Sequence, residues 1–220
     1  MYINYIKGLL QTLNPLQTAV VISYILNNSL GLFECYVISR NKYASQNTLL
    51  YYLTCALIAL TKCMHEIYSP KYPACFIYLF TYLFISNCLY LLVCMMYSRE
   101  KNNTWVCITF LTFICTIYYC IHKDILLVSN KQEVMHTILF LSSIVNSFIP
   151  FDALLSIMIS GRGDCPPQWI PLLTGIVQSL FTGLLDYTLN DTLMAPADAL
   201  GIAVHLFGLI VEIQCQFMRR

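Results

Sequence analysis

The residues of this chain best suited to chemistry are acids and amides that lie inside long hydrophobic segments. Glu34, Asp152 and Asp198 are the acids, and Asn28 and Asn146 are amides near the middle of their segments. A charge at mid-helix in a bilayer costs about 2.5–3.5 kcal/mol on insertion scales, so such side chains usually face a cavity or a partner. These residues predict a binding site or a path for a polar solute.

Several of these residues belong to a pattern that occurs twice along the chain. The matched pairs, in order, are Asn28 with Asn146, Glu34 with Asp152, Thr54 with Thr174, Glu66 with Asp186, and Cys75 with Asp198. The separation within a pair grows slowly along the chain, as insertions in loops would make it. A parallel internal repeat that flanks one unpaired segment is typical of transporters.

Asp198 is the first candidate for contact with a solute, because a carboxylate accepts hydrogen bonds from two neighbouring hydroxyl groups. It could instead cap the seventh helix, since it follows Pro196 and acids favour helix N-termini. Asn28 and Asn146 could each offer a donor and an acceptor to the solute. Alternatively, they could hydrogen-bond neighbouring helices.

Two acids are candidates for a gate near the loops on the side of the C-terminus, which the basic residues indicate as cytosolic. Glu34 and Asp152 could pair with Arg40 and Arg162 and separate from them as the protein changes state, or they could carry a proton. The alternative is a set of ion pairs at the headgroup edge, where long basic side chains reach out of the membrane.

Two further acids, Glu66 and Asp186, are matched at the opposite membrane face. They could form an outer gate with Lys62 or Lys71. The alternative is that both are exposed charges beside a loop, where water would hydrate them.

Prolines in or beside hydrophobic segments remove backbone hydrogen bonds and allow helices to bend. Pro150 and Pro167 could act in this way, although Pro167 could equally begin a helix, where the first N–H groups are unpaired. Gln178 and Ser179, in the middle of the sixth hydrophobic segment, could line a pocket.

Membrane-spanning helices must position these residues. Hydrophobic residues make up 58% of the chain and charged residues only 10%, which is unlike a soluble domain. The continuously apolar runs favour helices over a barrel, in which hydrophobicity would alternate. Segments long enough to span a bilayer are 16–39, 48–67, 73–97, 104–121, 134–159, 168–189 and 193–217.

Basic residues in the loops predict the orientation, because the cytosolic side is richer in Lys and Arg. With seven spans the two termini lie on opposite sides. The side of the C-terminus has Arg40, Lys42, Arg99, Lys101, Arg162, Arg219 and Arg220, and the other side has Lys7, Lys71, Lys123 and Lys131. We therefore expect an extracytosolic N-terminus and a cytosolic C-terminus, in the plasma membrane or an internal membrane.

The cysteines and histidines do not predict a metal centre. The eleven cysteines include no C-x-x-C pair and lie mostly within spans, which indicates small core residues. His136 and His205 lack spaced partners for a metal, so we expect buried, hydrogen-bonded histidines. The net charge of +1 and the lack of a basic run argue against nucleic acid as a partner. We find no catalytic constellation, and we expect neither an enzyme nor a cofactor.

The second half of the sequence resembles a known family. Residues 150–167 hold two prolines around a basic loop, Gly183-Leu184-Leu185 precedes Asp186, and residues 197–201 read Ala-Asp-Ala-Leu-Gly. In these features the chain resembles the SWEET sugar transporters of the MtN3 and PQ-loop group. The first half joins the resemblance through the internal repeat.

The resemblance implies an all-α membrane protein of seven helices, with a three-helix repeat (1–100), a linker helix (101–125) and a second repeat (126–220). It places Asp198 and Cys75 where the family has a pair of pocket asparagines, and it suggests Pro150 and Pro167 as hinges. The family's tryptophans fall here near Ala59 and Ser179, so no aromatic platform for a sugar is visible at those positions.

We therefore expect a facilitative, bidirectional sugar transporter that works by alternating access of two three-helix bundles. The substrate would be a mono- or disaccharide, and the apolar exterior would face lipid and permit homo-oligomers. A proton-coupled amino-acid transporter of the PQ-loop type is an alternative, since Glu34, Asp152 and Asp198 suit it. Another is a seven-span receptor, although the loops are short and the halves repeat.

Overall fold

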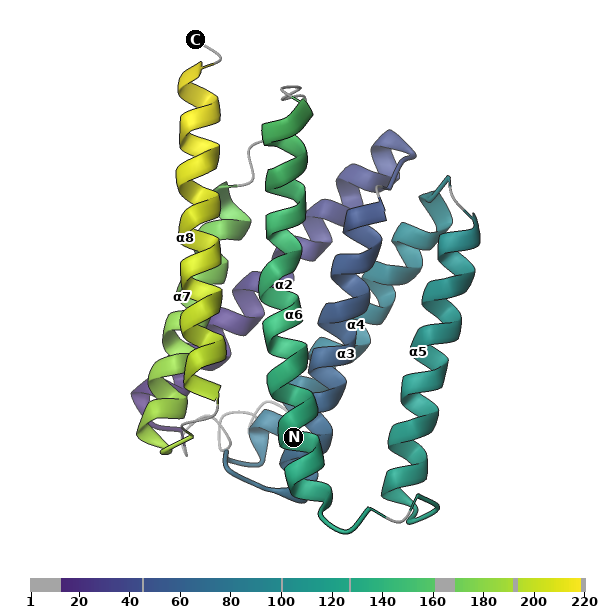
Figure 1. Cartoon of the computed structure of the whole chain (residues 1–220), viewed down its shortest axis with the longest axis vertical. Coiled ribbons are helices and arrows are strands. Elements are labelled where there is room, and N and C mark those ends of the chain that lie inside the picture. Colours follow the sequence, from purple (N-terminus) through teal and green to yellow (C-terminus); the bar gives the residue numbers. More distant parts are fainter. Residues whose placement is uncertain are drawn as a thin grey trace, which may run out of the picture. The chain divides into compact units, whose positions relative to one another are not determined.

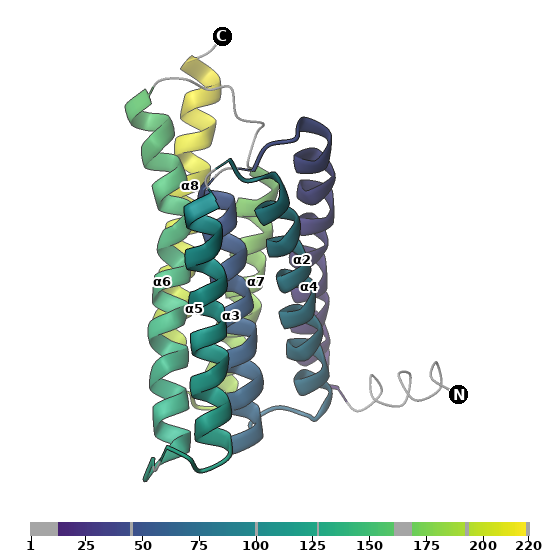
Figure 2. The same cartoon turned by 90° about the vertical axis from the view of Figure 1, so that its right-hand side faces the viewer.

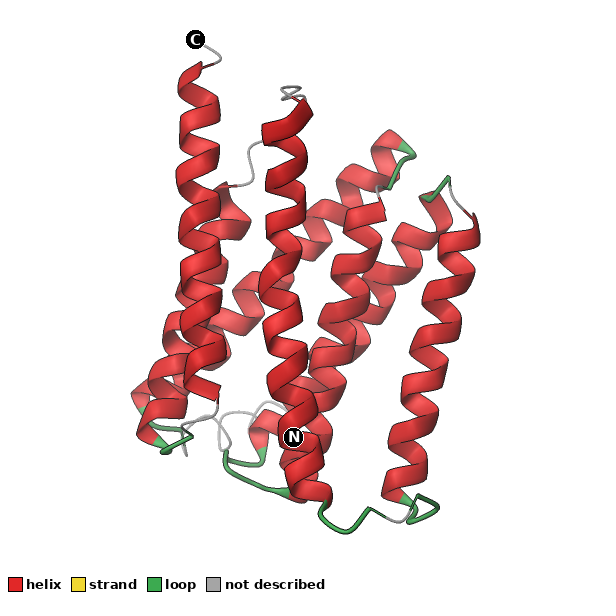
Figure 3. Ribbon diagram, in the orientation of Figure 1, coloured by secondary structure: helices red, strands yellow, loops and turns green. Residues whose placement is uncertain are grey.

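The computed structural model describes residues 13–44, 46–99, 101–126, 128–160, 169–191 and 194–218, apart from the side chains at 46–47, 103, 146–160, 169, 171 and 215–218. All regular elements within these ranges are helices (Figure 3). They are α2 (Pro15–Asn41), α3 (Gln46–Tyr68), α4 (Cys75–Tyr97), α5 (Lys101–His122), α6 (Lys131–Ser160), α7 (Trp169–Thr188) and α8 (Met194–Met218). Each coincides with one predicted span, so the all-α fold with seven helices is confirmed.

The described helices have the length and the surface of membrane spans. Five stretches are long and apolar enough to cross a bilayer: Pro15–Asn41, Thr48–Tyr68, Cys75–Tyr97, Thr104–His122 and Met194–Gln214. Large apolar side chains are exposed on them, among them Phe33 at 70%, Met96 at 71% and Trp105 at 67%. Such a surface would be unfavourable in water but is what lipid requires. The chain is an integral membrane protein.

Two helices begin at capping asparagines, which explains why they start before the predicted segments. Ahead of α2, the Gln17 N–H donates to Asn14 Oδ1 at 2.7 Å, and the Asn14 N–H donates to Gln17 Oε1 at 3.1 Å. Ahead of α6, the Glu133 N–H donates to Asn130 Oδ1 at 3.2 Å. These polar residues satisfy the N–H groups of the first turn and so extend each helix beyond its apolar run.

The chain divides into two compact units. One comprises the described residues up to Leu30 together with those from Ser143 onward, and α7 lies against α8 within it (Figure 1). The other is Gly31–Ser142, in which α3 packs along α4 and also contacts α5 (Figure 2). The division into repeats at 1–100 and 126–220 with a linker between them remains a prediction.

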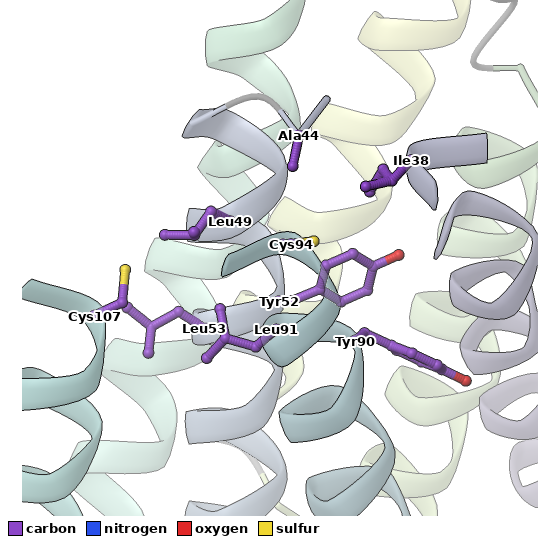
Figure 4. Close-up of a cluster of buried hydrophobic side chains, with 9 residues drawn as sticks. All are labelled: Ile38, Ala44, Leu49, Tyr52, Leu53, Tyr90, Leu91, Cys94 and Cys107. Carbon is purple, nitrogen blue, oxygen red and sulfur yellow. The ribbon is translucent and has the colours of Figure 1, made fainter. Parts of the chain in front are cut away.

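The second unit has one hydrophobic cluster near each end of α3. The cluster at the amino end is shown in Figure 4 and comprises Ile38, Ala44, Leu49, Tyr52, Leu53, Tyr90, Leu91, Cys94 and Cys107. The Ala44 N–H donates to the Tyr97 carbonyl at 3.2 Å, which ties the chain after α2 to the end of α4. The other cluster, of Tyr118, Ile121 and Met135, joins α5 to α6.

Candidate functional site

The first unit holds a polar cluster where α2 meets α7. The Asn27 amide nitrogen donates to Gln178 Oε1 at 2.7 Å, and the Thr174 hydroxyl donates to Asn27 Oδ1 at 3.0 Å. Thr174 and Gln178 lie one turn apart on α7, so one amide of α2 can reach both. All three side chains are half-buried. The predicted polar residue Gln178 is therefore part of a network, and its partner is Asn27.

The same face of α7 continues to Thr182, one turn beyond Gln178. The Thr182 hydroxyl donates to Asp198 Oδ1 at 3.0 Å, which joins α7 to α8. Gly183 permits this approach, since a Cβ at that position would lie 3.1 Å from the Cβ of Asp198. We call Asn27, Thr174, Gln178, Thr182 and Asp198 the polar stripe. It presents hydroxyl, amide and carboxylate groups from three helices.

The structure overturns the interpretation of Asp198 as a helix cap. Asp198 is the fifth residue of α8, beyond the first turn, where a capping side chain would have to lie. Its carboxylate reaches across to Thr182 instead. Cys75, the residue matched to it by the repeat, is the first residue of α4 and is half-buried. The two residues therefore do not hold equivalent positions in their helices.

The structure describes the side chains of some of the other predicted binding and hinge residues and not those of the rest. Asn28 is buried, at 8% exposure, and Ser179 is half-buried on α7. The side chains of Asn146, Pro150 and Asp152 lie outside the described residues, although the backbone there belongs to α6. Pro167 is outside them altogether. The roles predicted for all of these residues remain predictions.

The second unit places Glu34 among tyrosines. The Tyr52 hydroxyl donates to Glu34 Oε2 at 2.5 Å, so a tyrosine of α3 holds the carboxylate that we expected to pair with Arg40. Tyr52 is only 2% exposed. Its ring contacts the Tyr90 ring edge to face, with centroids 5.4 Å apart (Figure 4). A half-buried carboxylate is tolerable here because a strong hydrogen bond replaces part of its lost hydration.

Gly31 allows α4 to approach α2 at this point. A Cβ at Gly31 would lie 2.5 Å from Cε2 of Tyr90, closer than side-chain atoms pack. Tyr52 is thus in contact with a carboxylate, Tyr90 packs on Tyr52, and the sequence indicated neither contact. Tyr78 and Tyr82, which also lie on α4, are 60% and 47% exposed.

Glu66 and Asp186 are not the exposed charges that the sequence allowed. Glu66 is 2% exposed and Asp186 is 4% exposed. Glu66 Oε2 accepts hydrogen bonds from the backbone N–H groups of Lys71 and Tyr72, both at 3.1 Å. This carboxylate therefore stays buried because it satisfies N–H groups of the turn that leads into α4. The alternative in which water hydrates both acids is wrong.

His205 makes the hydrogen bond predicted for it. Its Nδ1 lies 2.6 Å from the carbonyl oxygen of Gly201, one turn earlier on α8, and the side chain is half-buried. The ring packs on α7 at Gly175, where an added Cβ would collide with it. Together with Gly183, Gly175 lets α7 and α8 pack closely beside the polar stripe.

The chemistry that these groups offer is hydrogen bonding. In the part of the chain that the structure describes, no three His, Cys, Asp or Glu side chains gather in a way that could hold a metal ion. The nine cysteines in that part are free thiols. The polar stripe offers acceptors and donors to hydroxyl groups, and the Glu34 site adds a carboxylate with aromatic neighbours.

Comparisons with known proteins support the fold. A solved structure described as a eukaryotic SWEET transporter superposes on this chain with a TM-score of 0.68 at 13% sequence identity, over 90% of this chain and 97% of that one. The chain matches no protein-family model, and no curated protein matches its sequence. The likeness is one of fold, and it agrees with the architecture implied by the sequence resemblance.

Proposed function

We propose that this protein is a facilitative transporter of a small polyhydroxylated solute, with mono- and disaccharides as the leading class. The observation that carries the proposal is the match in fold to a SWEET transporter over nearly the whole chain. The polar stripe supports it, because it places a carboxylate, two amides and two hydroxyls on adjoining transmembrane helices. Polar groups of this kind within a membrane ordinarily serve a solute or one another.

Asp198 is the proposed centre of recognition. In the described state Oδ1 accepts the Thr182 hydroxyl. A sugar hydroxyl is chemically equivalent to that hydroxyl and can take its place without leaving a carboxylate lone pair unsatisfied. The Asn27 and Gln178 amides can exchange their mutual hydrogen bond for two bonds to a second hydroxyl in the same way. The hydrogen bonds formed with the sugar are equivalent to those that the polar stripe gives up. Binding is therefore reversible, as a carrier requires.

Movement between states would use the remaining predicted residues. We assign Pro150 and Pro167 as hinges and Glu34, Asp152 and Asp186 as gating residues. For Glu34 the supporting observation is its bond to Tyr52, which links α2 to α3. A hydrogen bond between helices that opens and closes is the kind of two-state element that gating needs. Transport by this mechanism is alternating access and is driven only by the solute gradient.

The test is uptake of radiolabelled glucose and sucrose into cells that express the protein, without an ion gradient. Asp198→Ala should reduce saturable uptake about 10- to 100-fold at matched surface levels, which corresponds to the loss of a hydrogen bond to a charged group. Asp198→Asn keeps one acceptor and should retain more activity. Glu133→Gln is the matched control, because it also replaces an acid by an amide but lies exposed at the start of α6.

Two outcomes would contradict the proposal. Absence of saturable uptake of any sugar by the unmodified protein would refute sugar transport itself. Uptake that is unchanged in Asp198→Ala would refute the role of the polar stripe while leaving the activity in place.

A second candidate is proton-coupled transport of an amino acid. The half-buried carboxylates of Asp198 and Glu34 favour it, because a carboxylate pairs with an ammonium group as well as with hydroxyls. Amino-acid uptake that requires a pH gradient, with no uptake of sugars, would select this candidate over the first.

A further inference from the structure

Titratable side chains gather at the carboxyl end of α3, within the second unit. His65 and Glu66 are 3% and 2% exposed. His65 Nδ1 lies 3.4 Å from Glu66 Oε1. This distance is long for a bond between an imidazolium and a carboxylate, which closes to about 2.7–2.9 Å when both are charged. The two side chains are therefore in contact, at a separation longer than that of a bond between two charged groups.

A second histidine lies against the first. The rings of His65 and His136 have centroids 5.2 Å apart and are tilted by 48° to one another. His136 comes from the first turns of α6, so two different helices supply the rings. His65 Nε2 is buried and makes no hydrogen bond among the described residues. A buried ring nitrogen that makes no hydrogen bond costs free energy. A change in its protonation or in its contacts would relieve that cost.

Glu66 connects these histidines to the backbone. Its Oε1 faces His65, and its Oε2 accepts the N–H groups of Lys71 and Tyr72. One carboxylate therefore links a titratable ring to the turn between α3 and α4. A change of charge on the ring alters the electron density that the carboxylate offers to those N–H groups.

The elements packed around the pair supply other charged and titratable groups. From α5, His122 Nδ1 lies 3.1 Å from the Tyr68 hydroxyl, and the Tyr118 hydroxyl lies 2.6 Å from the Thr61 hydroxyl. These contacts set further titratable groups beside the same end of α3.

Basic residues flank this end of α3 as well. From α6, Lys131 lies over the Tyr68 ring and forms an ion pair with Asp124. Lys62 of α3 lies over the Phe80 ring of α4. Of all these groups, Glu66 is the carboxylate in contact with His65.

We propose that His65, Glu66 and His136 form a proton-binding site. Imidazole is the side chain that ordinarily changes charge between pH 5 and pH 8. A proton taken from water by one of the two rings creates an imidazolium, and Glu66 stabilises it. Two rings 5.2 Å apart cannot both hold a charge without strong repulsion. The site therefore binds its first proton much more tightly than its second.

Proton binding at this site acts on the connection between α3 and α4. When the carboxylate forms a short hydrogen bond to an imidazolium, its hydrogen bonds from the Lys71 and Tyr72 N–H groups weaken. The site thus converts a change in pH on one side of the membrane into a change at a helix–helix turn. It does so whatever solute the protein carries.

The test is a histidine titration of the full-length protein in detergent micelles, followed by NMR of ¹³Cε1-labelled rings. The chain has four histidines, so His→Gln variants assign every resonance. His65 and His136 should titrate in two coupled steps. In His136→Gln, His65 should titrate in a single step, because the second ring no longer competes for the proton. In Glu66→Gln, the two steps should differ from those of the unmodified protein, because the carboxylate that contacts His65 is gone.

Two further observations complete the test. The amide protons of Lys71 and Tyr72 should shift with the midpoint of the first step in the unmodified protein and not in Glu66→Gln. His205→Gln is the control, because His205 belongs to the other unit, and it should leave the steps unchanged. Glu66→Gln keeps a carbonyl acceptor for the turn, and His136→Gln tests the coupling without altering Glu66.

The proposal is overturned if His65 and His136 titrate independently of one another and of Glu66, or if neither titrates between pH 4.5 and pH 8.5. Neither result bears on sugar uptake, since the titration is made without a solute. Failure here and failure of the proposed transport activity are thus distinguishable.

Discussion

Glu34 keeps its carboxylate within a hydrophobic helix because Tyr52 donates a hydrogen bond to it. Water cannot reach the tyrosine hydroxyl to replace this hydrogen bond, since the side chain is 2% exposed. Each group therefore depends on the other, and loss of either leaves an unsatisfied polar atom in the interior.

Replacement of Tyr52 by Phe should lower the free energy of unfolding by roughly 1–2 kcal/mol, as expected for a strong hydrogen bond between helices in a membrane. The measurement is unfolding of the purified protein in mixed micelles of increasing SDS content. Tyr119→Phe is the matched control, since Tyr119 is 58% exposed on α5 and should change little.

A double-mutant cycle gives the decisive comparison for this pair. If the bond exists, Tyr52→Phe should cost much less in a Glu34→Gln background than in the unmodified protein. Equal costs in the two backgrounds would show that the pair does not interact.

Single residues were only partly predictable from the sequence. Gln178 and Asp198 stood out because polar groups are rare in spans, and both belong to the polar stripe. Asn27 is 151 positions from Gln178, and nothing in the sequence indicates that pairing. The regular spacing of Thr174, Gln178 and Thr182 was the available signal for the stripe, since residues four apart share a helix face.

At the level of helices, close packing depends on small residues at contact points. Tyr90 rests on the backbone of α2 at Gly31, and its ring cannot withdraw easily because Tyr52 packs against it. Gly31→Ala would gain about 1 kcal/mol of helix propensity but would force the ring to move. Overpacking of this kind costs about 1–3 kcal/mol.

We therefore expect Gly31→Ala to destabilise the protein and Gly183→Ala to do so less, because the added Cβ lies 2.5 Å from Tyr90 in the first case and 3.1 Å from Asp198 in the second. Unfolding in SDS mixtures measures both. The double variant Gly31→Ala with Tyr90→Ala should be more stable than the sum of its single effects predicts. Strict additivity would contradict the contact.

Helices themselves were the most predictable elements, because a bilayer demands long apolar segments and the sequence shows them directly. The ends of the helices were less predictable. Capping by Asn130 and Glu133 lets α6 begin at Lys131, three residues before its predicted start at 134. The burial of Glu66 was missed, because the backbone turn that needs its oxygen exists only in the folded chain.

At the scale of the whole molecule, the distribution of basic residues sets the expected orientation. An odd number of spans puts the termini on opposite sides, and the richer set of Arg and Lys lies on the side of the C-terminus. A tag before Met1 should therefore be extracytosolic, and a tag after Arg220 should be cytosolic. Protease digestion of sealed vesicles of known orientation measures both.

The reverse arrangement would show that the loop charges do not orient this chain. Tags on the same side would mean that one of the helices does not span. Either result would leave the helical fold intact. The gating residues, however, would no longer lie at the membrane faces to which we assign them.

The fold is shared with a SWEET transporter at only 13% identity, so most side chains differ while the fold is the same. A fold can host several functions, which is why the substrate must come from the site. The positions where the family has tryptophans hold small residues here, near Ala59 and Ser179. Tyr52 and Tyr90 pack against one another in another place, and both are buried there.

The most direct test of facilitative transport is counterflow in proteoliposomes made with the purified protein. Vesicles are loaded with unlabelled sugar, diluted into a trace of the labelled sugar, and followed without any ion gradient. A carrier that exchanges solute by alternating access predicts a transient accumulation of label above equilibrium, reduced in Asp198→Ala. Label that only equilibrates at the rate of protein-free vesicles, for every sugar tried, would contradict the proposed function.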